Sequence, residues 1–94
     1  MTYRLAMPVT VALHLTAAER AECLATLENA AANQDAHQAR APRWPCSGEP
    51  FRKAAALLAN GDSLPRLECR FLLNATPGGA FRDRLVGLMF TVGA

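Results

Sequence analysis

No stretch of this chain is apolar enough to cross a membrane as a helix. Such a helix needs roughly 18 consecutive apolar residues, and every apolar run in the 94 residues is much shorter. The first apolar stretch is interrupted by Arg4, Pro8, Thr10 and His14, and no basic segment precedes it, which argues against a secretion signal. We therefore expect a cytoplasmic protein that makes no membrane contact.

Cysteine and histidine are also scarce. Cys23, Cys46 and Cys69 are an odd number of cysteines with no close pair, whereas disulfide frameworks of small secreted proteins use even numbers at short spacings. We expect reduced thiols. His14 and His37 do not stand with the cysteines at the spacings that zinc sites use. The sequence therefore predicts no metal and no other cofactor.

Lysine is nearly absent, because nine of the ten basic residues are arginine. Residues 1–39 contain two basic and four acidic residues, and residues 40–94 contain eight basic and four acidic residues, so the formal charges are −2 and +4. Guanidinium groups make forked contacts with carboxylates and phosphates. The second part of the chain is thus expected to meet an acidic or phosphate-bearing partner.

The clearest pattern in the sequence is an alternation over residues 3–15, where every odd position is apolar. A period of two is typical of a strand with one apolar face. Pro8 lies inside this segment, and thirteen residues exceed the usual strand length. We predict a first strand that bends at Pro8 into two pieces.

Two helices are predicted after this strand, in a chain long enough for one domain over residues 1–94. Thr16 and Glu19 form the signature of a capping box, which predicts a helix over residues 17–33. Pro50 suits a first helical turn and Gly61 a helix end, which predicts a second helix over residues 50–60. Residues 34–49 contain two prolines and no periodicity, and we predict a long loop there.

Two further strands are predicted at residues 64–73 and 81–92. The first alternates between apolar and polar residues, and the second becomes apolar on both faces. The order is then β-α-α-β-β. We predict an α+β fold, a two-layer sandwich in which a three-stranded, mostly antiparallel sheet carries both helices on one face, with strand 81–92 in the centre.

One candidate partner-binding site combines arginine with the only tryptophan. Trp44 stands between two prolines, which lowers the entropy cost of presenting its ring, but the same ring could instead cover the small core as a lid. Trp and Arg are frequent hot spots of binding. The candidate set comprises Arg40, Arg43, Trp44, Arg52, Lys53, Arg66, Arg70, Arg82 and Arg84.

A second candidate site is apolar. If the last strand is apolar on both faces and only one layer of helices exists, one face stays uncovered, and an uncovered apolar patch implies a partner. The residues of this face are Val86, Leu88, Phe90 and Val92. A symmetric homodimer is the simplest arrangement that covers them.

A catalytic site is not predicted. Cys46 and Arg52 have the spacing of the phosphate loop of tyrosine-phosphatase-like enzymes, but Glu49 and Pro50 lie within it, one adding negative charge and the other removing an amide donor. Nothing resembles a nucleophile elbow or a glycine-rich phosphate loop. We expect a protein without catalytic activity.

The sequence thus favours a small protein-interaction module, a regulator or inhibitor of the kind that phages and plasmids encode. It would bind a partner protein or nucleoprotein. The alternative is a nucleic-acid-binding protein that uses the arginine-rich face of residues 40–84, because arginines beside an aromatic ring can contact phosphates and stack on a base.

Overall fold

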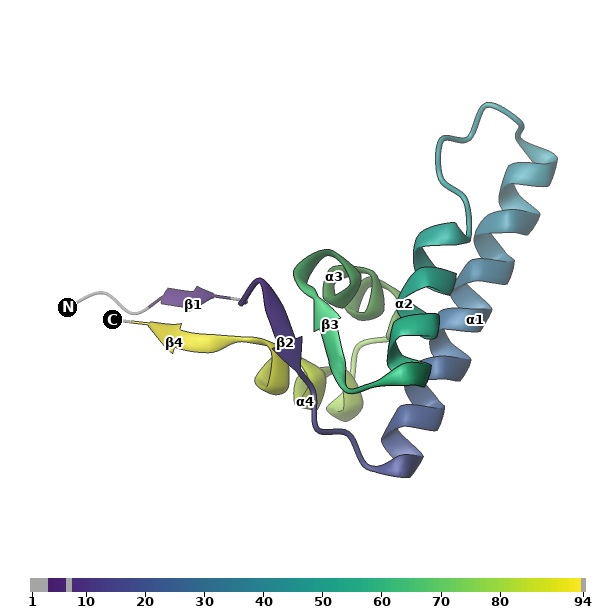
Figure 1. The fold of residues 1–94 in the computed structure, drawn as a ribbon. Coiled ribbons are helices and arrows are strands. Elements are labelled where there is room, and N and C mark those ends of the chain that lie inside the picture. Colours follow the sequence, from purple (N-terminus) through teal and green to yellow (C-terminus); the bar gives the residue numbers. More distant parts are fainter. Residues whose placement is uncertain (1–3, 7, 94) are drawn as a thin grey trace.

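The computed structural model describes residues 4–6 and 8–93. The elements follow in the order β1 (Arg4–Ala6), β2 (Thr10–Ala12), α1 (Ala17–Arg40), α2 (Glu49–Asn60), β3 (Ser63–Pro65), α3 (Arg66–Ala75), α4 (Ala80–Met89) and β4 (Thr91–Gly93). The described chain is mostly helical, and its strands form two separate two-stranded antiparallel sheets, β1 with β4 and β2 with β3 (Figure 1). The predicted α+β sandwich with a three-stranded sheet is therefore wrong.

The first predicted strand is confirmed as two short pieces on either side of Pro8. β1 pairs with β4 and β2 pairs with β3, so the two pieces belong to different sheets. In the second sheet Val11 and Leu64 are opposite each other and both are buried. The apolar face that the alternation predicts is confirmed at Val11 and Leu13, which are buried, but Val9 is exposed.

Helix α1 begins as predicted and ends later than predicted. The Thr16 hydroxyl accepts a hydrogen bond from the Glu19 amide at 3.1 Å, and the Glu19 carboxylate accepts one from the Thr16 amide at 3.0 Å, which completes the capping box. The helix continues to Arg40, because the first residue that cannot extend it is Pro42. The loop consequently covers residues 41–48 only, half of what the sequence indicated.

The segments predicted as strands 64–73 and 81–92 are largely helices α3 and α4. In α3 the buried residues are Glu68, Cys69, Leu72 and Leu73, which is a helical spacing. Leu67, which the strand prediction placed inside, is 59% exposed. A short apolar run fits a period of two and a period of 3.6 about equally well, and packing against α2 decides between them.

The core lies where α1 and α2 run antiparallel beside each other and α3 and α4 close the remaining side (Figure 1). Its fully buried side chains include Leu27 of α1, Leu58 of α2, Leu72 of α3 and Leu85 of α4. Among the described residues, no helix is both long enough and apolar enough to span a membrane.

Candidate interaction site

Three of the basic residues in the candidate set are engaged by carboxylates of the same chain. Arg52 Nη1 lies 2.5 Å from Asp35 Oδ2, and Lys53 Nζ lies 3.3 Å from Glu68 Oε1. Arg84 makes a forked contact with Glu19. These pairs join α2 to α1, α2 to α3 and α4 to α1, so each of the three cations connects two helices.

Two more of the set bind backbone carbonyl groups. Arg66 Nε donates to the Pro8 oxygen and Arg82 Nε to the Leu73 oxygen, both at 3.4 Å. Arg40, Arg43 and Arg70 form no ion pair or side-chain hydrogen bond with any described residue. The structure therefore leaves three of these arginines with free guanidinium groups, and two of the three are near Trp44.

Trp44 is fixed on the exposed flank of α1 by polar contacts. Its indole N–H donates to Gln34 Oε1 at 3.0 Å, and its carbonyl accepts a hydrogen bond from Gln38 Nε2 at 3.2 Å. Its ring meets the His37 ring edge-on, with centroids 4.5 Å apart. The amide of Trp44 also donates to the Ala41 carbonyl at 2.8 Å. The loop is thus folded back onto the last turns of the helix.

The ring of Trp44 does not serve as a lid over the core. Trp44 is 39% exposed and does not belong to the buried cluster or to the side chains packed against it. The nearest core residue along α1 is Ala31, and α2 begins only at Glu49. Of the two alternatives that the sequence left open, the structure selects the exposed ring.

We call residues 36–48 the basic tip. Figure 1 shows the end of α1 and the following loop projecting beyond α2 and away from the rest of the molecule. The tip contains Arg40, Arg43 and His37 but no acidic residue, since Asp35 precedes it and Glu49 follows it. Guanidinium groups that form no ion pair with a described residue create a positive potential at this end.

A neutral cleft of about 370 Å³ continues from the tip along α1. Its lining includes the amide side chains of Asn29, Asn33, Gln34 and Asn74, with Phe51 between α1 and α3, and no charged side chain among the described residues. Gln34 lies just before the tip and connects the two places, because its side-chain oxygen also accepts the hydrogen bond of the Trp44 indole. The cleft and the Trp44 ring therefore share one neighbouring amide side chain.

In the Cys46–Arg52 segment, a backbone amide and the Arg52 guanidinium already bind a carboxylate of the same chain. The Gly48 amide donates to Asp35 Oδ1 at 2.9 Å, and Arg52 contacts the other oxygen of the same carboxylate. These two contacts, the Gly48 hydrogen bond first, hold the pKa of Asp35 below its usual value. A carboxylate of α1 thus occupies the place at the start of α2 where a phosphate loop would hold its anion.

The three cysteines differ sharply in exposure. Cys46 is exposed, whereas Cys23 and Cys69 are buried, and all three are free thiols. Burial raises the pKa of Cys23 and of Cys69 to about 11, since a thiolate is poorly solvated there. Within residues 4–6 and 8–93, no group of three potential metal ligands comes together.

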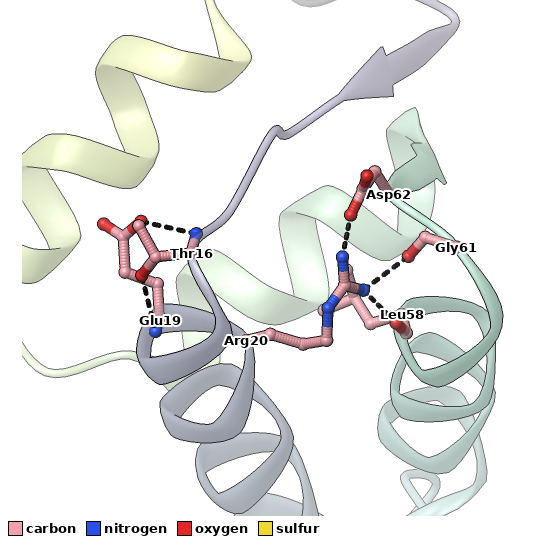
Figure 2. A network of polar contacts seen from close by, with 6 residues as sticks. All are labelled: Thr16, Glu19, Arg20, Leu58, Gly61 and Asp62. Carbon is pink, nitrogen blue, oxygen red and sulfur yellow. Dashed lines mark hydrogen bonds and ion pairs between the residues drawn. The ribbon is translucent and has the colours of Figure 1, made fainter.

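Arg20 lies at the centre of a polar network that the sequence did not indicate. Figure 2 shows its guanidinium donating to the carbonyl groups of Leu58 and Gly61, the latter at 2.7 Å, and pairing with Asp62. A cation at this place satisfies free carbonyls at the end of α2. No local pattern points to it, because its carbonyl partners are 38 and 41 positions away in the chain.

The second candidate site was inferred from a last strand with one uncovered apolar face, and that strand prediction is wrong. Val86 and Leu88 belong to helix α4, and together with Phe90 they are partly buried against the core. Val92 lies in β4, and its side chain is outside what the structure describes. The apolar character of this segment therefore reflects helix packing, not an uncovered strand.

Comparison with protein-family models, with curated proteins and with solved structures found no match. The function has to be argued from the geometry of the chain itself.

Proposed function

We propose that the protein is a small interaction module, a regulator or inhibitor without catalytic activity, that binds a partner protein through the basic tip. The observation that supports this proposal best is the position of Trp44. Gln34 and His37 contact its large ring, and Gln38 binds its backbone carbonyl. The ring stays 39% exposed at the end of the molecule, beside Arg40 and Arg43, where it adds nothing to the core.

A fixed ring is suited to binding because little of its freedom remains to be lost. Association immobilises flexible side chains at a cost of about 0.5–1.5 kcal/mol each, and the contacts with Gln34, His37 and Gln38 have already ordered Trp44. Trp and Arg carry much of the binding energy in many interfaces. In this proposal Trp44 is the anchor and the amides of the neutral cleft supply polar contacts around it.

The charge of the tip indicates an acidic partner surface. Arg40 and Arg43 are exposed and form no ion pair with a described residue, so a partner carboxylate would not have to displace one of the chain's own. Attraction of this kind mainly raises the association rate and makes it depend on salt. The three free thiols favour a reducing compartment, and we propose a cytoplasmic location.

Affinity capture from cells of the source organism tests this proposal. The full chain is immobilised as wild type, as Trp44→Ala, as the double variant Arg40→Ala/Arg43→Ala, and as Arg70→Ala. The last is a matched control, because Arg70 is equally exposed and free of ion pairs but lies on α3. We expect partners to be retained by wild type and by Arg70→Ala and lost by both tip variants.

A nuclease arm separates this proposal from the second candidate. Arg40, Arg43 and an exposed indole could also bind nucleic acid, through phosphates and a stacked base, although the sequence pI of about 8.7 is below that of most dedicated nucleic-acid-binding domains. Partners that survive nuclease treatment support the protein-binding proposal. Loss of all partners after nuclease, with steep weakening between about 50 and 200 mM salt, would favour nucleic acid instead.

A further inference from the structure

The sheet formed by β1 and β4 stands apart from the helical body. It joins Arg4–Ala6 to Thr91–Gly93 in an antiparallel register with Leu5 opposite Val92. Figure 1 shows this two-stranded ribbon extending away from the helices, and neither strand has another element as its main neighbour among the described residues. Within residues 4–6 and 8–93, both outer edges of the ribbon are consequently free of a neighbouring strand.

A two-stranded ribbon of this length is not stable alone in water. Independent stability needs three or more strands, or packing against a helix. Natural proteins protect free edges with charges, prolines, bulges or a covering element. The edge of β1 has two of these features, the charged residue Arg4 and the nearby Pro8, whereas β4 reads Thr-Val-Gly and has neither.

We propose that β4 pairs antiparallel with β4 of a second copy of this chain. The result is a four-stranded sheet in the order β1–β4–β4–β1 around a twofold axis. Antiparallel pairing of a strand with its own copy is self-complementary, as a twofold interface requires, and β4 brings no charge to the contact. This interface replaces the predicted one on Val86, Leu88 and Phe90, and it does not depend on the proposed function of the tip.

The position of the ribbon is compatible with such a dimer. Figure 1 shows the ribbon and the basic tip at different ends of the molecule, so pairing through β4 leaves both tips exposed. Two tips in one dimer can engage a partner that offers two binding sites, which raises the overall affinity without any new contact.

Sedimentation equilibrium on the full chain tests the proposal. Consecutive amides in a strand point to opposite sides, so of Thr91 and Val92 one directs its N–H away from β1. Proline at that position removes a hydrogen bond between the two copies, and proline at the other weakens the ribbon itself. We therefore measure wild type, Thr91→Pro and Val92→Pro, with Val9→Ser as the control, since Val9 is 73% exposed and lies outside the ribbon.

We expect wild type and Val9→Ser to have twice the monomer mass. In at least one proline variant the dissociation constant of the dimer should rise by about tenfold or more. The far-ultraviolet circular dichroism of the helices should stay unchanged. A wild-type monomer at concentrations up to about 100 µM would overturn the proposal. A dimer that neither proline variant weakens would overturn it as well, because the contact would then lie elsewhere.

Discussion

At the scale of single residues, Trp44 is the side chain whose position has the clearest consequence. Its ring is tied to Gln34 and His37 on the outside of α1, so its removal exposes no core surface. Leu58, in contrast, is completely buried between the helices. Substitution of Trp44 should therefore affect binding, and substitution of Leu58 should affect stability.

We predict that Trp44→Ala lowers the free energy of unfolding by about 1 kcal/mol or less, and that Leu58→Ala lowers it by about 2–5 kcal/mol because it leaves a cavity. Urea unfolding followed by circular dichroism measures both. Equal losses in the two variants would mean that Trp44 does cover the core and that its exposure is of no functional interest.

The basic residues illustrate how much of the candidate site the sequence could indicate. Arg40, Arg43 and Trp44 are close together in the chain, so their proximity in space follows from sequence distance. The partners of Arg52 and Arg84 are 17 and 65 positions away. Whether an arginine is free or paired depends on such distant carboxylates, and no local pattern contains that information.

At the scale of elements, Glu19 connects two helices and caps one of them. It accepts hydrogen bonds from Arg84 of α4 and from the Thr16 amide at the start of α1, and these lower its pKa from 4.5 to about 2. A carboxyl group with a lowered pKa in the folded state contributes stability above its unfolded pKa. That contribution is lost as the pH falls from about 4.5 through about 2.

We predict that Glu19→Gln is less stable than wild type at neutral pH and loses less stability on acidification. Arg84→Gln should behave in the same way, because it removes the other half of the contact. The control is Glu22→Gln, an exposed carboxylate on the same helix. The measurement is urea unfolding between about pH 5 and pH 2; parallel acid profiles for wild type and Glu19→Gln would refute the role of this contact.

Gly48, the N-cap of α2, lies close against the backbone of α1. A Cβ atom at this position would lie 2.9 Å from the carbonyl carbon of Ala31 and 2.7 Å from Arg52 Nη1. Gly87, in the last turn of α4, has no atom within 4 Å of such a Cβ. The close backbone approach of this part of the chain is therefore at Gly48.

We predict that Gly48→Ala destabilises the protein by about 1–3 kcal/mol, because α2 must move away from α1. Gly87→Ala should stabilise it by about 0.5–1 kcal/mol, since alanine is the better helix former and has room there. Thermal unfolding of the two variants measures both effects. If Gly48→Ala is as stable as wild type, α2 does not pack against Ala31 in this way.

The helices show which parts of the fold the sequence could predict. Capping at Thr16 and the break at Gly61 depend on neighbours in the chain, and both helix boundaries were predicted correctly to within a residue. In α3 and α4 the apolar runs are short and fit a period of two and a period of 3.6 about equally well. Their helical form depends on packing, of α3 against α2 and α1 and of α4 against α3 and β2. The sheet prediction was wrong for that reason.

At the scale of the whole molecule, the basic tip and the β1–β4 ribbon lie at different ends (Figure 1). The described chain measures 49 × 31 × 24 Å along its principal axes. Four ion pairs lie among the described residues; three join two helices, and the fourth joins α1 to Asp62 after α2. The positive charge that remains unpaired beside an aromatic ring is at the basic tip, and this is the central claim on which the proposed function depends.

Quenching of fluorescence tests that claim most directly, because Trp44 is the only tryptophan in the chain. An exposed indole in a positive potential attracts iodide and repels caesium. At low ionic strength we predict a Stern–Volmer constant for iodide roughly twofold or more above that for caesium, and a loss of this difference in Arg40→Ala/Arg43→Ala but not in Arg70→Ala. Equal quenching by both ions in wild type, or no quenching by either, would contradict the account.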